Sequence, residues 1–254
     1  SSIVRSTSSS RQGFFMPRDT AVSSGVRPRW RRAVASPWFH LLLALIVLAL
    51  IQAFVVKVYR IPSASMEPTL DVGDRILVAR LAYVGADPRD GDVVVFTTSA
   101  QWDAAEGRAS TPSFLGWIGD VVGFGPSNAH TLVKRVVATE GETVRCCDTE
   151  GRILVDDKPV PAPYPDEEYP FVSGVQDCTT RPVSARCFPS ITVPPRSLLV
   201  MGDNRSNSSD SVIACRNRPE ARGDECARFV DLDHVVGPAF FRLWPFDRVG
   251  PVAG

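Results

Sequence analysis

The chain has 254 residues and carries 28 basic and 28 acidic side chains, so its formal net charge is zero. The charges are unevenly distributed: the segment before Val56 holds seven arginines and one acid, which leaves 21 bases against 27 acids in the rest of the chain. A negative balance over most of the chain argues against nucleic acid as a partner. The 198 residues after Val56 are enough for one or two packed β lobes.

Residues 1–36 are rich in Ser, Arg and Pro and show no helical or strand periodicity. This composition is typical of disorder, and we expect a disordered basic segment here. A transit peptide has a similar composition, because it is also rich in Arg and Ser and poor in acids. The sequence leaves both interpretations open.

An apolar segment runs from Trp38 to Val56 and is broken only by His40 and Gln52. As a helix it would extend about 28 Å, close to the thickness of the hydrocarbon layer. We therefore expect one transmembrane helix within residues 37–58, in contact with membrane lipid. The preceding arginines predict a single-pass protein of the cell membrane, with a cytoplasmic N-terminus and residues 59–254 outside the cytoplasm. A cleaved secretory signal fits less well, because the apolar stretch is too long and no small-residue cleavage site follows it.

Beyond this segment, short runs of β-branched residues alternate with Gly, Pro and Asp clusters, which predicts a mainly β domain over residues 59–254. The expected strands are Ile76–Ala79, Val93–Thr97, Leu132–Ala138, Thr143–Cys147, Ile153–Val155, Leu198–Met201 and Val235–Arg242. Two stretches break the pattern. Residues 146–197 hold four cysteines and many prolines and predict a disulfide-linked insertion. Residues 101–129 include an apolar, Gly-spaced run, for which contact with the membrane and packing on the sheet are alternatives.

All of the cysteines follow Val56, and they are Cys146, Cys147, Cys178, Cys187, Cys215 and Cys226. An even number on the oxidising side of a membrane indicates disulfides, although six cysteines allow 15 connectivities. Closeness in sequence favours pairing of Cys215 with Cys226. A zinc site is less consistent, because the chain has no Cys-x-x-Cys pair and only His130 and His234 could add ligands. We expect no metal and no cofactor.

Lys134 is a candidate general base. It is one of three lysines and lies inside the apolar run Thr131–Val137, whereas Lys57 at the membrane edge and Lys158 in a turn have ordinary explanations. Burial disfavours the ammonium form, so a lysine in apolar surroundings loses its proton more easily and can accept one during catalysis. The chain must then supply a nucleophile.

Two polar segments could provide partners for this base. Ser63 and Ser65 lie one residue apart between Pro62 and Pro68, which stiffen the chain on both sides. Residues 202–211 follow an apolar strand and contain hydroxyl, amide and carboxylate groups that can hold an amine by hydrogen bonds. Taken alone, either segment would be interpreted as a solvated loop.

Taken together, these segments resemble a type I signal peptidase. The resemblance rests on motifs in the family's order, namely Pro62–Met66 with Pro68–Leu70, Gly91–Phe96, Val133–Val137, and Gly202–Arg205 with Asn207–Ser208 and Asp210–Ser211. The closing segment 236–245 also resembles the family's final strand. The resemblance implies a membrane-anchored β peptidase that removes N-terminal signal peptides from exported preproteins. Its implied partners are those signal peptides, membrane lipid and the secretion machinery.

The resemblance also implies a role for each matching residue. Ser65 matches the nucleophile, and Lys134 matches the general base. Ser63, together with the Ser65 backbone amide, matches the oxyanion hole, and Ser208 matches the hydroxyl that orients the lysine. The positions expected to bind substrate are Tyr59, Ile61, Leu132 and Val133, and the supporting positions are Asp203, Arg135 and Asp210. The family prefers small residues at the first and third positions before the cut.

One feature departs from the family. An arginine commonly follows the Asp-Ser pair and binds the aspartate, whereas here Val212 follows Asp210 and Ser211. Either Arg216 reaches back to Asp210, or a disulfide-braced loop replaces the ion pair.

Other classes of protein fit the sequence less well. A penicillin-binding acyltransferase needs Ser-x-x-Lys, and no serine stands three residues before a lysine. A Ser-His-Asp hydrolase would need His130 or His234, and neither accompanies a Gly-x-Ser-x-Gly motif. A non-catalytic, membrane-anchored β module is the remaining alternative.

Overall fold

The computed structural model describes residues 36–102, 130–160 and 168–252. Two compact units divide the chain, Ser1–Ala44 and Leu45–Gly254, and every strand reported below belongs to the second. The segment predicted to be disordered, apart from its last residue, and the 101–129 stretch, apart from its first two residues, lie outside the described residues. Those two expectations remain predictions.

Helix α2 spans Pro37–Phe54. The expected boundary at residue 58 is wrong, because residues 56–58 belong to strand β1 (Val56–Arg60), which pairs with strand β2 (Arg75–Ala79). The valines of β1 favour an extended backbone, and pairing with β2 satisfies the hydrogen-bonding groups of that backbone. None of the helices in the described residues is both long enough and apolar enough to cross a membrane.

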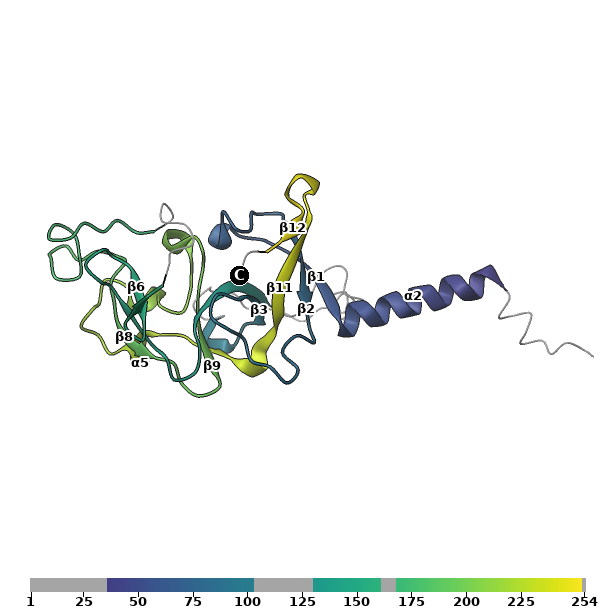
Figure 1. Ribbon diagram of the computed structural model, residues 1–254, viewed down its shortest axis with the longest axis horizontal. Coiled ribbons are helices and arrows are strands. Elements are labelled where there is room, and N and C mark those ends of the chain that lie inside the picture. The colour runs from purple at the N-terminus through teal and green to yellow at the C-terminus, as the bar shows by residue number, and fades with distance from the viewer. Residues whose placement is uncertain (1–35, 103–129, 161–167, 253–254) are drawn as a thin grey trace, which may run out of the picture. The chain divides into compact units, whose positions relative to one another are not determined.

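The larger sheet has the strand order β1-β2-β11-β3-β4-β9-β10, and β12 pairs with β11 (Figure 1). Its other strands are β3 (Val93–Thr97), β4 (Thr131–Ala138), β9 (Ser197–Met201), β10 (Val230–Asp231), β11 (Val235–Trp244) and β12 (Gly250–Pro251). All of these pairings are antiparallel. Strand β11 pairs with both β2 and β3, and shifts in its register bend it to follow the two neighbours. This order leaves β1 at one edge of the sheet.

A smaller sheet, ordered β7-β6-β5-β8, occupies much of the segment that the sequence predicts as an insertion. Its strands are β5 (Thr143–Cys146), β6 (Ile153–Val155), β7 (Lys158–Pro159) and β8 (Phe188–Thr192). Disulfides join Cys146 to Cys147 and Cys178 to Cys187. The insertion is therefore disulfide-linked, as expected, but it is also a lobe with a sheet of its own.

The mainly β fold predicted from the sequence is confirmed, and each of the seven expected strands overlaps a strand of the structure. Five strands were not expected, namely β1, β8 and the two-residue strands β7, β10 and β12. The residues of β1 continue the apolar helical segment, and β8 contains Pro189, which weakens a strand assignment.

One hydrophobic cluster holds the segment that carries Ser65. Ile61, Met66 and Leu70 are each at most 2% exposed and pack with Ile76 and Val78 of β2. Full burial of each such side chain contributes roughly 1.5–3 kcal/mol, so the backbone on both sides of Ser65 is firmly held. The serine itself needs no packing of its own to keep its position.

The expected pairing of Cys215 with Cys226 is confirmed, and this disulfide joins η4 (Ile213–Cys215) to α5 (Gly223–Cys226). Replacing both cysteines by alanine should lower the free energy of unfolding by about 3 kcal/mol, because the cross-link restricts a short loop in the unfolded chain. Urea unfolding of the two proteins measures this difference. Peptide mapping without reductant should recover the Cys215 and Cys226 peptides as a linked pair, and a link from Cys215 to any other cysteine would contradict the assignment.

Candidate active site

The side chains of Ser65 and Lys134 meet directly. Ser65 lies in a single turn of 3-10 helix, η1 (Ala64–Met66), and Lys134 lies in β4, where it is paired with Val94 of β3. Lys134 Nζ donates a hydrogen bond of 2.5 Å to Ser65 Oγ, and the lysine is only 3% exposed. Residues 69 positions apart in the chain thus form a buried amine and hydroxyl pair. Such a pair can exchange a proton and is chemically suited to nucleophilic attack by the hydroxyl oxygen.

The hydroxyl of Ser63 lies next to the hydroxyl of Ser65. Its Oγ lies 3.5 Å from Ser65 Oγ, and Ser63 is exposed. Ser63 has an extended backbone immediately before η1. A hydroxyl here can donate to an oxyanion that forms beside Ser65.

The loop that carries Ser208 packs against the backbone of Ser65. Asn204 N donates to Ser65 O at 3.2 Å, and Gly202 N donates to Ser208 Oγ at 3.2 Å. A Cβ atom added to Gly202 would collide with Ser65 O and with the Ser208 side chain. Gly202 is therefore the contact point between the nucleophile segment and the loop, and Ser208 is buried beside it. Orientation of Lys134 by Ser208 stays a prediction.

Arg135 and Asp203, two of the expected supporting positions, form an ion pair. Arg135 Nε and Nη2 each donate to one oxygen of Asp203 at 2.7 Å, and Asp203 is fully buried. Thr69 Oγ1 donates to the same carboxylate at 2.5 Å. Because side chains alternate along a strand, Arg135 and Lys134 point to opposite faces of β4. The cation of Arg135 is thus neutralised on the face away from the amine.

A small cavity of about 70 Å³ lies beside Ser65. Its walls contain all four residues expected to bind substrate, Tyr59, Ile61, Leu132 and Val133. The walls also contain Arg60, Pro62, Ser63, Ser65, Met66 and Thr131. A cavity of this size has room for several water molecules, and therefore for a small side chain.

Arg216 reaches back to Asp210, which is one of the two alternatives that the sequence left open. Arg216 Nη2 lies 3.7 Å from Asp210 Oδ2, and the two side chains are 4% and 0% exposed. The disulfide-braced loop is also present, because Cys215 directly precedes Arg216. Arg228, which sequence analysis did not identify, donates to Asp210 O at 2.9 Å and to Ser209 Oγ at 3.0 Å.

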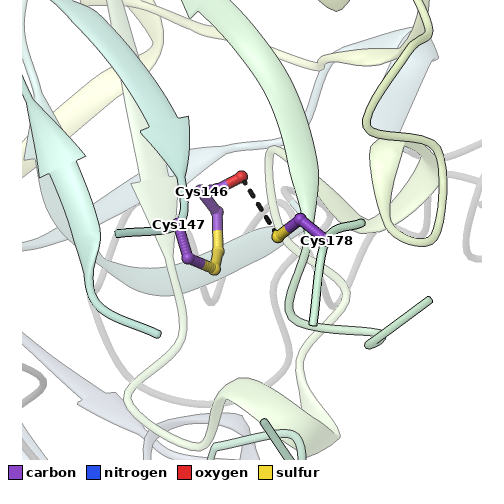
Figure 2. A group of neighbouring side chains, drawn as sticks. All are labelled: Cys146, Cys147 and Cys178. Carbon is purple, nitrogen blue, oxygen red and sulfur yellow. Dashed lines mark hydrogen bonds between the residues drawn. A yellow bond between two sulfur atoms is a disulfide. The ribbon is translucent and has the colours of Figure 1, made fainter. Parts of the chain in front are cut away.

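Three sulfur atoms, of Cys146, Cys147 and Cys178, lie within 4.8 Å of one another (Figure 2). This spacing matches that of metal-binding thiolates and was not expected from the sequence. All three cysteines are in disulfides, however, and a disulfide sulfur is not a thiolate. In this oxidised form the group does not offer the ligands that a soft metal ion needs.

Comparison with known proteins identified similar sequences and one similar solved structure. The family model described as "Signal peptidase, peptidase S26" matches residues 35–244. "Signal peptidase I" of Mycobacterium tuberculosis (strain ATCC 25618 / H37Rv) is 35% identical over 219 residues, covering 83% of this chain and 72% of that protein. "Probable signal peptidase I" of Mycobacterium leprae (strain TN) is 34% identical over 263 residues, covering 94% and 88%. A solved signal peptidase I from Enterococcus faecalis V583 is 20% identical with a TM-score of 0.31, covering 60% of this chain and 96% of that one.

Gly202→Ala should destabilise the protein by about 1–3 kcal/mol, because the added methyl group overpacks the contact between Ser65 O and Ser208. Gly250→Ala is the matched control, since a Cβ there meets nothing within 4 Å. Thermal unfolding of the two variants and the unmodified protein measures the effect. Equal unfolding temperatures for Gly202→Ala, Gly250→Ala and the unmodified protein would show that Gly202 is not tightly packed against Ser65 O and Ser208.

Proposed function

The chain belongs to the signal peptidase family S26, and we propose that it removes signal peptides from exported preproteins with Ser65 as nucleophile and Lys134 as general base. The observation that carries the assignment of residues is the hydrogen bond of 2.5 Å between the buried Lys134 Nζ and Ser65 Oγ. Burial favours the neutral amine, which can accept the hydroxyl proton.

The reaction has two steps. Lys134 accepts the proton of Ser65 as Oγ attacks the carbonyl carbon of the scissile bond, and the resulting ammonium protonates the leaving amine of the mature protein. The signal peptide is then held on Ser65 as an ester. A water molecule gives its proton to Lys134 and attacks that ester, and the ammonium returns the proton to Ser65 Oγ as the signal peptide leaves.

Ser63 and the Ser65 backbone amide stabilise the oxyanion that forms in each step. The position of Ser63 Oγ, 3.5 Å from Ser65 Oγ, supports this role. Loss of one such donor costs about 3 kcal/mol of barrier in other hydrolases. Ser208, beside Gly202, keeps the amine of Lys134 directed at Ser65.

The cleft selects small side chains at the first and third positions before the cut. The support is the cavity of about 70 Å³, whose walls include Ile61, Leu132 and Val133. Strand β1 is an edge strand, so an extended signal peptide can add to the sheet beside the nucleophile.

We infer that the apolar segment Trp38–Val56, of which α2 is the helical part that the structure describes, anchors the enzyme in the cell membrane as a single-pass protein, with the catalytic domain outside the cytoplasm. The exposure of its side chains supports this. The described large apolar side chains of α2, such as those of Leu42, Leu45 and Leu48, are not covered by other described parts of the chain. The disulfides fit an oxidising compartment. Membrane lipid and the secretion machinery are the expected partners beside the preprotein.

Lys134→Arg should be as inactive as Lys134→Ala, although arginine keeps the charge. A guanidinium remains protonated above about pH 12 and cannot accept a proton, whereas a buried lysine can. Activity of the unmodified enzyme should rise with pH as Lys134 deprotonates. Preprotein cleavage measured against pH for the three proteins, with folding checked by circular dichroism, tests this. Turnover by the arginine form comparable to that of the unmodified enzyme at any pH would remove Lys134 from the base role.

Replacing His130 and His234 together by alanine should leave cleavage within about tenfold of the unmodified enzyme, because no histidine transfers a proton in this mechanism. The described contacts of His234 support a structural role, since its Nδ1 lies 3.7 Å from Asp231 Oδ2 and its side chain is 40% exposed. The measurement is the initial rate of preprotein cleavage. A loss beyond about a thousandfold in a folded double variant would move the base assignment to a histidine.

A further inference from the structure

Two exposed arginines lie opposite one another on the strands that lead to Ser65. Arg60 of β1 is the register partner of Arg75 of β2, and both side chains are exposed. Residues directly opposite on antiparallel strands have Cβ atoms about 4.5–5.5 Å apart and place their side chains on the same face of the sheet. The two cations therefore face solvent side by side. Like charges in this arrangement destabilise a sheet, so stability gives no reason for them.

Neither guanidinium has a counter-charge within the part of the chain that the structure describes. No ion pair or side-chain hydrogen bond joins Arg60 or Arg75 to another described residue. Asp71 and Asp74, the acids that precede Arg75, are both paired with Arg248. The face that carries Arg60 and Arg75 is thus positive and open to an anionic group from outside the chain.

Arg60 lies at the rim of the cavity beside Ser65. Tyr59 and Ile61 line this cavity and also belong to the hydrophobic cluster that packs on β2, and Ile61 N continues the strand pairing by donating to Asp74 O at 2.9 Å. Because side chains alternate along an extended chain, Arg60 points to the other, solvent-exposed face. Arg60 is nevertheless one of the residues that line the cavity, which places it where the two faces meet.

An extended peptide in this cleft presents alternate side chains to the two faces. The proposed function places the first and third side chains before the cut in the cavity, on the side of Ile61. The second side chain lies between them and points to the opposite face, which is the face of Arg60 and Arg75. Strand β1 is the edge strand next to β2 (Figure 1), so a peptide that pairs with it brings this side chain within reach of long cross-strand neighbours.

We propose that Arg60 and Arg75 are specificity-determining residues that favour an acidic side chain at the second position before the cut and disfavour a basic one. The inference rests on the proposed function and adds a charge preference to the preference for small residues at the neighbouring positions. A guanidinium suits this task because its planar array of donors matches a carboxylate. Water screens an exposed pair, so the arginines grade substrates by rate and do not exclude any of them.

An anionic lipid surface is the other partner that two exposed arginines could meet, because β1 begins two residues after the end of α2. The place of Arg60 in the wall of the cavity beside Ser65 favours the substrate. The test therefore uses the full chain in micelles of a neutral detergent, which offer no anionic headgroup.

The experiment compares three preproteins that have alanine at the first and third positions before the cut and carry Asp, Asn or Lys at the second. The unmodified enzyme should cleave the Asp form about three- to tenfold faster than the Lys form, measured as kcat/KM, with the Asn form between them. Arg60→Gln and Arg75→Gln should each weaken this preference, and the double variant should abolish it. Arg60→Glu should weaken it further than Arg60→Gln, and Arg60→Lys should retain it. The preference should also shrink in about 1 M salt, because salt screens exposed charges.

Arg218→Gln is the matched control, because Arg218 is an exposed arginine with no ion pair to a described residue and lies outside the cavity wall. This variant should keep the preference. Equal rates for the three preproteins, or a preference that survives the loss of both arginines, would overturn the inference and leave the proposed function in place. A loss in Arg60→Gln that is the same for all three preproteins would indicate a structural role and would also overturn it. If the unmodified enzyme cleaves none of them, the proposed function fails, and the inference fails with it.

Discussion

The structure depends on keeping one amine out of water and against one hydroxyl. Lys134 is 3% exposed, and its Nζ lies 2.5 Å from Ser65 Oγ. An isolated ammonium would be costly in such a place, which favours the neutral form that the proposed base role requires. Much of the surrounding architecture can be understood as holding this contact. The strand pairing of β4 fixes the lysine, and the buried Ile61, Met66 and Leu70 fix the segment that bears the serine.

Two buried arginines of the polar segments around this contact are paired with buried carboxylates. Arg135 is neutralised by Asp203 on the opposite face of β4, and Arg216 reaches Asp210. Buried ion pairs of this kind add little to stability, because desolvation offsets much of their attraction. Their value here is that they hold the polar loop in one arrangement without placing a net charge next to the amine.

The motifs of the site could be predicted from the sequence because each is chemically unusual on its own. A lysine in an apolar strand, two serines between prolines and a dense polar loop are local patterns, and the structure brings Ser63, Ser65, Lys134 and Gly202 together. What could not be predicted depends on contacts between distant parts of the chain. The hydrogen bond from Thr69 to Asp203, for example, spans 134 positions. The end of α2 was misplaced for the same reason, because pairing with β2 decides where β1 begins.

The central claim is that Ser65 performs the covalent step, and the most direct measurement is cleavage of one preprotein by the unmodified enzyme and by Ser65→Ala, read by mass spectrometry. We predict that the unmodified enzyme releases the mature protein and the intact signal peptide. The folded Ser65→Ala variant should leave the preprotein uncut, because alanine has no hydroxyl to attack the carbonyl carbon. Cleavage at the same bond and at a similar rate by Ser65→Ala would contradict the account.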